Sequence, residues 1–121
     1  MSDKRRVNKV AEKIRAILSQ YLIRNGDSRL SLITLTSVIV SPDLRIAKVY
    51  WTASGAKDRM DEIEEALEDS SGAFRKAVGE DLGTRFVPHL KFFYDDTLDT
   101  VEQVERLFAK IRAEDQAKEK E

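Results

Sequence analysis

The sequence of 121 residues contains no cysteine, and this absence excludes several classes of protein. Without thiols there is no disulfide scaffold, no cysteine nucleophile and no thiolate metal site. The single histidine, His89, is too little for a histidine-rich metal site, and we expect it to be an ordinary surface or half-buried residue of a strand. We therefore expect neither a metal nor a cofactor.

Long apolar runs are missing as well. No segment approaches the ~18 apolar residues that a membrane-spanning helix needs, and the charged first residues lack the apolar core of a secretory signal. We therefore expect a cytoplasmic protein that does not contact membranes. Walker, dinucleotide-binding and H-E-x-x-H motifs are absent too, and the Asp95-Asp96 pair is more typical of a loop that ends a strand than of a cation site. These absences argue against an enzyme.

Charge is what the sequence has in excess. Charged residues make up 36% of the chain and apolar residues 41%, so we expect one compact domain with a large solvated surface. The formal net charge of −1 hides an asymmetry, because residues 1–52 carry ten Lys and Arg against four Asp and Glu, whereas residues 53–121 carry eleven against eighteen. The excess of +6 in the N-terminal part favours a polyanion, such as nucleic acid, as its partner.

Hydrophobic periodicity divides the chain into helices and strands. Three segments carry apolar side chains at helical spacing: residues 6–25, 58–83 and 99–112. Three others are rich in β-branched and aromatic residues and predict strands: residues 30–41, 44–52 and 85–94. The Ser-Pro-Asp turn at residues 41–43 predicts that the first two strands form an antiparallel hairpin.

The second helical segment is interrupted by Ser-Ser-Gly at residues 70–72, where we expect a kink or a break. The resulting order, α-β-β-α-kink-α-β-α, predicts an α+β fold of two layers with a helical crossover between the last two strands. We expect residues 1–98 to form the folded domain. Residues 99–121 then form a charged C-terminal extension, which begins as a helix and is disordered over residues 113–121.

Basic side chains recur on several of these elements. Nine of them are candidates for contacts with RNA phosphates: Arg5, Arg6, Lys9, Lys13, Arg45, Lys48, Arg75, Lys76 and Arg85. Tyr50 lies on the same strand face as Lys48, and an aromatic ring there can stack on an unpaired base. Arg24 and Arg29 flank the end of the first helix and extend the basic surface. For any single residue, the alternative is that it only solvates the outer face of its element.

Four stretches of the sequence, in order, resemble the ribosome-binding factor A family of bacterial small-subunit assembly factors. They are RVNKVAEKI at residues 6–14, VIVSPDLRIAKVY at 38–50, LEDSSGAFR at 67–75 and RFVPHLKFFYD at 85–95. The resemblance covers about residues 4–98, and four motifs in the right order are far more specific than any one alone.

The resemblance implies a type II KH-like domain that binds the small (30S) ribosomal subunit and its 16S rRNA near the 5′ end. It further implies a role in late assembly and rRNA processing, especially at low temperature, and no catalytic activity. RNA-binding KH domains usually clamp the backbone with a G-x-x-G loop, which this chain lacks. The family has an Ala-x-Gly kink instead, so the resemblance adds Ser70, which stands where Ala is usual, and Gly72 to the RNA-binding candidates.

Two other functions remain open. The first is a protein-interaction module that acts through the C-terminal helix and an exposed sheet edge. The second is a generic binder of single-stranded RNA, which the few aromatic residues and the missing G-x-x-G make less favourable. We expect a monomer, because one core consumes the apolar residues.

Overall fold

The computed structural model describes residues 2–84 and 86–119. In these ranges the chain forms four helices and three strands, in the predicted order. They are α1 (Ser2–Arg24), β1 (Ile33–Val40), β2 (Ile46–Ala53), α2 (Ala56–Asp69), α3 (Ser71–Leu82), β3 (His89–Tyr94) and α4 (Thr97–Glu119). The order agrees with the predicted two-layer, KH-like α+β arrangement, followed by one more helix.

The three strands form one sheet in the order β1-β2-β3. Strands β1 and β2 pair antiparallel, which confirms the predicted hairpin, and a bulge lies between Leu35 and Ser37. Strands β2 and β3 pair parallel, so α2 and α3 form the expected crossover. Strand β3 begins at His89 rather than at residue 85, because Pro88 just before it has no N–H to donate to a ladder.

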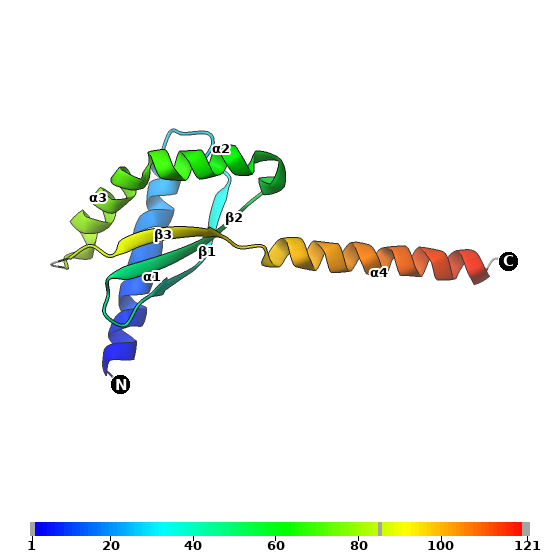
Figure 1. Ribbon diagram of the computed structural model, residues 1–121, viewed down its shortest axis with the longest axis horizontal. Coiled ribbons are helices and arrows are strands. Elements are labelled where there is room, and N and C mark those ends of the chain that lie inside the picture. Colours follow the sequence, from blue (N-terminus) through cyan, green and yellow to red (C-terminus); the bar gives the residue numbers. More distant parts are fainter. Residues whose placement is uncertain (1, 85, 120–121) are drawn as a thin grey trace.

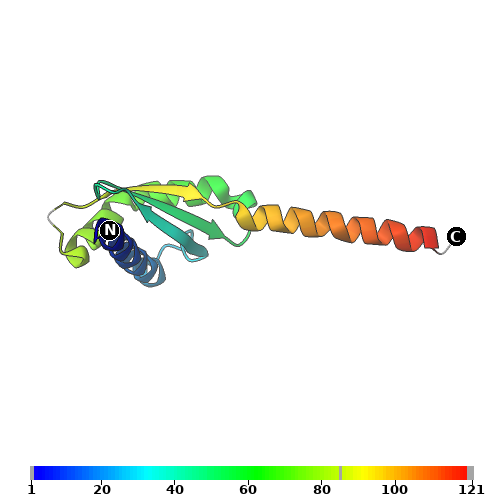
Figure 2. The same ribbon diagram turned by 90° about the horizontal axis from the view of Figure 1, so that it is seen from below.

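One face of the sheet is covered by helices and carries the core. Alternate residues of β2 point into it, and Ala47, Val49 and Trp51 are all buried. Helix α1 supplies buried residues at helical spacing against this face, and Figure 2 shows it running beneath the sheet. The ring of Phe74, on α3, lies 5.0 Å from that of Tyr21 on α1 and 5.2 Å from that of Phe92 on β3, between ring centroids. Phe74 therefore contacts one ring on α1 and one ring on the sheet.

The interruption between α2 and α3 is confined to Ser70, whose φ of −92° and ψ of 0° are not helical. The backbone hydrogen bonds from Ser70 N–H to Ala66 O (3.0 Å) and from Phe74 N–H to Ser70 O (2.9 Å) continue across it. The predicted kink is thus confirmed, although Ser71 and Gly72 already belong to α3. The side chain of Ser70 makes no cap hydrogen bond to α3.

Helix α4 leaves the domain at the end of β3 and extends away from it as a single long arm (Figure 1). Residues 113–119 are helical, so the prediction that residues 113–121 are disordered is wrong for this stretch, and residues 120–121 lie outside the described residues. The apolar stripe of α4 is exposed: Val101, Val104, Leu107, Phe108 and Ile111. The core therefore does not consume all apolar residues, and the reason we gave for a monomer is wrong.

Candidate nucleic-acid interface

A groove of about 600 Å³ at one end of the domain gathers basic side chains from four parts of the fold. Arg6 comes from α1, Arg45 from the turn between β1 and β2, and Arg75 from α3. His89, the first residue of β3, lies beside them. The groove also has an apolar lining, to which Val10, Leu82, Val87 and Pro88 contribute.

The turn that carries Arg45 is held firmly. The N–H of His89 donates to the carbonyl of Arg45 at 2.7 Å, which ties the turn to β3. The carboxylate of Asp43 accepts bonds from the Ser41 hydroxyl (2.6 Å) and the Arg45 N–H (3.1 Å), and these bonds lower the pKa of Asp43. Leu44 between them adopts a φ of +62°, an unfavourable conformation for a residue with a side chain. Arg45 lies in this turn, before β2, and not on the strand as predicted.

The side chain of Arg45 is available to a ligand. It is 84% exposed, and its approach to Asp43 is a marginal ion pair at 4.0 Å between Nε and Oδ2. An exposed pair of this kind contributes little, so Arg45 exchanges Asp43 for a phosphate at small cost.

The other predicted basic residues of α1 lie on the same helix as Arg6. Arg6, Lys9 and Lys13 are exposed and follow one another at steps of three and four, which places them along one side of the helix. Arg5 is exposed four residues before Lys9. Of the four predicted cations of α1, the structure therefore brings Arg6 together with Arg45 and Arg75, and it leaves Arg5, Lys9 and Lys13 exposed on the same helix.

The kink borders a second groove, of about 420 Å³. Gly72 and Arg75 line one part of it, and Glu64 and Glu68 of α2 line another. Arg75 and His89 line both grooves, so the two are adjacent. Because the carboxylates of α2 repel phosphate, RNA is favoured at the Arg75 end only. Ser70, the other predicted kink residue, is half-buried.

Three predicted residues are not part of this basic cluster. Lys48 is exposed on the other face of the sheet, because its neighbours Ala47 and Val49 point into the core. Lys76 is exposed on α3 but lines neither of the two grooves. Arg85 lies outside the described residues.

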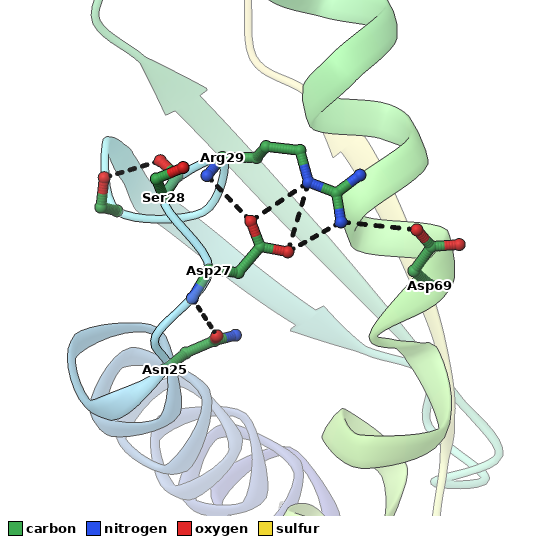
Figure 3. A network of polar contacts seen from close by, with 6 residues as sticks. Asn25, Asp27, Ser28, Arg29 and Asp69 are labelled. Carbon is green, nitrogen blue, oxygen red and sulfur yellow. Dashed lines mark hydrogen bonds and ion pairs between the residues drawn. The ribbon is translucent and has the colours of Figure 1, made fainter.

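Arg29 does not belong to the basic surface either, contrary to expectation. Its guanidinium lies 2.8 Å from a carboxylate oxygen of Asp27 and 3.4 Å from one of Asp69 (Figure 3). The hydrogen bonds that Asp27 accepts from Arg29 lower the pKa of Asp27 and raise the pKa of Arg29. Arg29 thus has a structural task, because it links the loop after α1 to the last residue of α2, next to the kink.

His89 is exposed, as expected for a surface residue of a strand, but the sequence did not place it in the groove. As a lone histidine in a strand pattern it carried no signal of its own, and its place beside Arg45 follows from the parallel pairing of β2 with β3. Within the described ranges, no three Asp, Glu or His side chains are grouped so that they could hold a metal ion. Of the helices described, none combines the length and apolar character required to cross a bilayer.

Comparison with known proteins decides the family. The family model described as "Ribosome-binding factor A" matches residues 6–108. The chain belongs to the ribosome-binding factor A family. Two relatives with this name come from Citrifermentans bemidjiense, 38% identical over 92% of this chain and 94% of the relative, and from Acidothermus cellulolyticus, 37% identical over 95% and 77%.

Solved structures of ribosome-binding factor A show the same fold. The crystal structure from Thermus thermophilus matches with a TM-score of 0.65 at 22% identity, over 73% of this chain and 93% of that one. Coordinates of the Thermus thermophilus factor fitted into a cryo-EM map of a 30S complex with ribosome-binding factor A match with a TM-score of 0.54 at 23% identity, over 70% and 90%. The α+β, KH-like fold predicted from the sequence is thereby confirmed.

Proposed function

We propose that this protein binds the small (30S) ribosomal subunit through its 16S rRNA, near the 5′ end, and assists late assembly and rRNA processing. Its action is occupancy without catalysis: it holds an immature rRNA conformation until it is released. We further propose that it does so in the cytoplasm, as a monomer, and that the need for it is greatest at low temperature. Membership of the ribosome-binding factor A family supports the ribosomal part of this proposal.

The observation that carries the RNA-binding part is the groove where Arg6, Arg45 and Arg75 converge from three elements. Guanidinium groups match phosphate oxygens in geometry and charge, and three of them around one groove give a site for a folded RNA backbone. The row of Arg5, Lys9 and Lys13 extends the same surface along α1. Lys76 and Arg85 are proposed as further phosphate contacts, and Ser70 and Gly72 as the backbone that the RNA approaches.

Co-sedimentation tests this proposal. The purified protein is pelleted with 30S subunits, 70S ribosomes and naked RNA over a salt series. Selective pelleting with 30S subunits that fades as salt rises is the expected result, because phosphate contacts release counterions. Replacing Arg6 and Arg75 by Gln together should weaken 30S binding and flatten its salt dependence.

Arg106→Gln is the matched control, because Arg106 is an exposed arginine on α4, far along the chain from the groove. It should bind like the wild type. Equal pelleting of the wild type with any RNA would reduce the protein to a generic RNA binder. Absence of binding to every ribosomal particle at low salt would refute the proposal.

A second candidate function is favoured by α4. Its stripe of five exposed apolar side chains is typical of a helix that packs against a protein. In this alternative the chain is a protein-interaction module, and its affinity changes little with salt.

A further inference from the structure

The face of the sheet that points away from the core carries a combination of side chains that the basic groove does not use. Strands β1, β2 and β3 contribute exposed or half-buried residues to it, which we call the open sheet face: Ser37, Ile39, Lys48, Tyr50, Lys91 and Phe93. They alternate with core residues along each strand, so they share one side of the sheet. None of these six side chains carries a negative charge.

Two aromatic rings are in contact on the open sheet face, one on the central strand β2 and one on the edge strand β3. Tyr50 and Phe93 are register partners on the parallel strands β2 and β3, and their rings are stacked with centroids 5.6 Å apart and planes at 30°. Phe93 is 41% exposed although it is a large apolar residue. Flat rings left open on adjacent strands are suited to stacking against unpaired bases, which present a π-face whatever their sequence.

Two lysines lie next to the rings. Lys48 and Lys91 are also register partners, two residues before Tyr50 and Phe93 on the same strands. Like charges directly opposite one another disfavour the strand pair. Among the described residues, neither lysine has a carboxylate within 4.0 Å. An anion bound between the two lysines removes this repulsion. The lysines and the rings are two residues apart on each strand, which is a distance of roughly 7 Å.

We propose that the open sheet face is a second RNA-binding surface, which takes a single-stranded segment. Its bases stack on Phe93 and Tyr50, and its phosphates pair with Lys48 and Lys91. This inference rests on the proposed function, because it presumes that the protein meets rRNA, and it adds the class of RNA structure recognised. The two surfaces divide the work: the arginine groove binds backbone phosphates, and the open sheet face binds unpaired bases.

Fluorescence anisotropy of the full chain tests the proposal with two labelled strands, a short single-stranded RNA of mixed sequence and an abasic strand of equal length. The wild type should prefer the strand with bases. Phe93→Leu, which removes the ring but keeps an apolar side chain, should bind the RNA roughly tenfold more weakly and the abasic strand unchanged. Phe93→Tyr keeps a ring and should retain the affinity. Replacing Lys48 and Lys91 by Gln should lower the slope of log K against log salt by about 0.7 per lysine.

Phe108→Leu and Lys110→Gln on α4 are the matched controls, because they remove an exposed ring and an exposed lysine far from the sheet. Far-UV circular dichroism and thermal unfolding check that every variant is folded. Unchanged affinity and unchanged preference over the abasic strand in Phe93→Leu would overturn the proposal. So would a wild type that does not bind the RNA at low salt.

Co-sedimentation of the same variants with 30S subunits separates this inference from the proposed function. One outcome is that the wild type pellets with 30S subunits and the sheet variants bind RNA and subunits with wild-type affinity. The inference then fails and the proposed function stands. If the sheet variants lose 30S binding but keep their affinity for the short RNA, the face binds a ribosomal protein and the inference is overturned. If the wild type does not pellet with subunits but its affinity for the short RNA depends on Phe93 as predicted, the proposed function fails and the inference stands.

Discussion

Gly72 and Leu44 both depart from the residue that local stability favours at their positions. Gly72 is exposed in the first turn of α3, where glycine is a poor helix former. Leu44 holds a left-handed backbone conformation in the turn that carries Arg45. Gly72 lines the groove next to the kink, and Leu44 lines the basic groove. Unfavourable local conformations are a common feature of binding sites, where the shape of the backbone matters more than its stability.

Replacing Gly72 by Ala should stabilise the protein and weaken its binding to 30S subunits. A methyl group there would meet no atom within 4 Å, and the backbone does not have a positive φ. The free energy of unfolding should therefore rise by about 0.5–1 kcal/mol, as measured by urea denaturation. The added methyl group should hinder close approach of an RNA backbone, which co-sedimentation measures.

Gly83→Ala is the contrasting control, because Gly83 has a φ of +70° and ends α3. It should destabilise the protein by about 1 kcal/mol. If Gly72→Ala is more stable and binds 30S subunits as the wild type does, Gly72 is not part of the interface.

At the scale of elements, the first turn of α4 is attached to the sheet although the rest of the helix is not. The Asp95 carboxylate accepts hydrogen bonds from the Thr36 hydroxyl at 2.7 Å and from the Thr97 N–H at 3.0 Å, so it joins β1 to the start of α4. The hydroxyl of Tyr94 donates to Asp99 in the same turn. Burial, and then this bond, raise the pKa of Tyr94 to about 12. The direction in which the arm leaves the domain is thus set by a few polar contacts.

Asp95→Asn should lower stability at neutral pH and reduce the sensitivity of the protein to acid. The hydroxyls of Thr97 and Thr36 lower the pKa of Asp95 below its usual range. Because the folded pKa is depressed, the contribution of this carboxylate is complete above its unfolded pKa of about 3.9 and is lost as the pH falls through the lower folded value. Urea unfolding between neutral pH and about pH 3 measures both effects.

Asp96→Asn is the control for this prediction, because the side chain of Asp96 is exposed. Its unfolding curve should follow that of the wild type at every pH. Equal acid sensitivity of Asp95→Asn and the wild type would mean that the bonds between Thr36, Asp95 and Thr97 do not form in solution.

At the scale of the whole molecule, basic and acidic side chains lie on different parts of the domain, and α4 lies outside the packed core. The basic side chains gather at the end of the domain where α1, α3 and the β1–β2 turn meet. Acidic side chains dominate α2, which has seven Asp and Glu in Ala56–Asp69 against one Lys and one Arg. The domain therefore has a basic surface and an acidic one, an arrangement that suits orientation on a polyanion. Helix α4 is a separate arm, and none of its side chains that the structure describes is buried in the core.

Ending the chain after Thr100 should leave the domain as stable as the full-length protein. The side chains of residues 101–116 are all exposed, so their removal should change the free energy of unfolding by less than about 0.5 kcal/mol. The denaturant m-value should also stay unchanged, because it follows the surface that unfolding exposes. In contrast, Leu18→Ala, at a side chain only 1% exposed, should cost about 2–5 kcal/mol.

A large loss of stability in the shortened chain would mean that α4 packs against the domain in solution. Co-sedimentation of the shortened chain with 30S subunits also separates the two candidate functions. Retained binding favours the arginine groove as the interface, whereas lost binding favours a protein partner for α4.

Features that depend on near neighbours along the chain could be predicted from the sequence. The spacing of Ile14, Leu18 and Leu22 predicts a helix with one buried face, and all three are buried. The hairpin turn and the kink at Ser70 were likewise predictable, because turn residues and poor helix formers act locally. The extent of α4 was not, because its last residues lack an apolar stripe, whereas Glu, Lys, Ala and Gln extend a helix that has already formed.

Which cations lie close together depends on the packing of the whole domain. Arg45 and His89 come together because β2 and β3 pair in parallel after a crossover, and that pairing depends on how the whole core packs. The same packing separates Lys48 from the basic residues of α1 by the thickness of the sheet, and it pairs Arg29 with Asp69 instead of leaving it to a ligand. Periodicity tells which face of an element is buried, but the neighbours across elements follow from the way the layers close over one another.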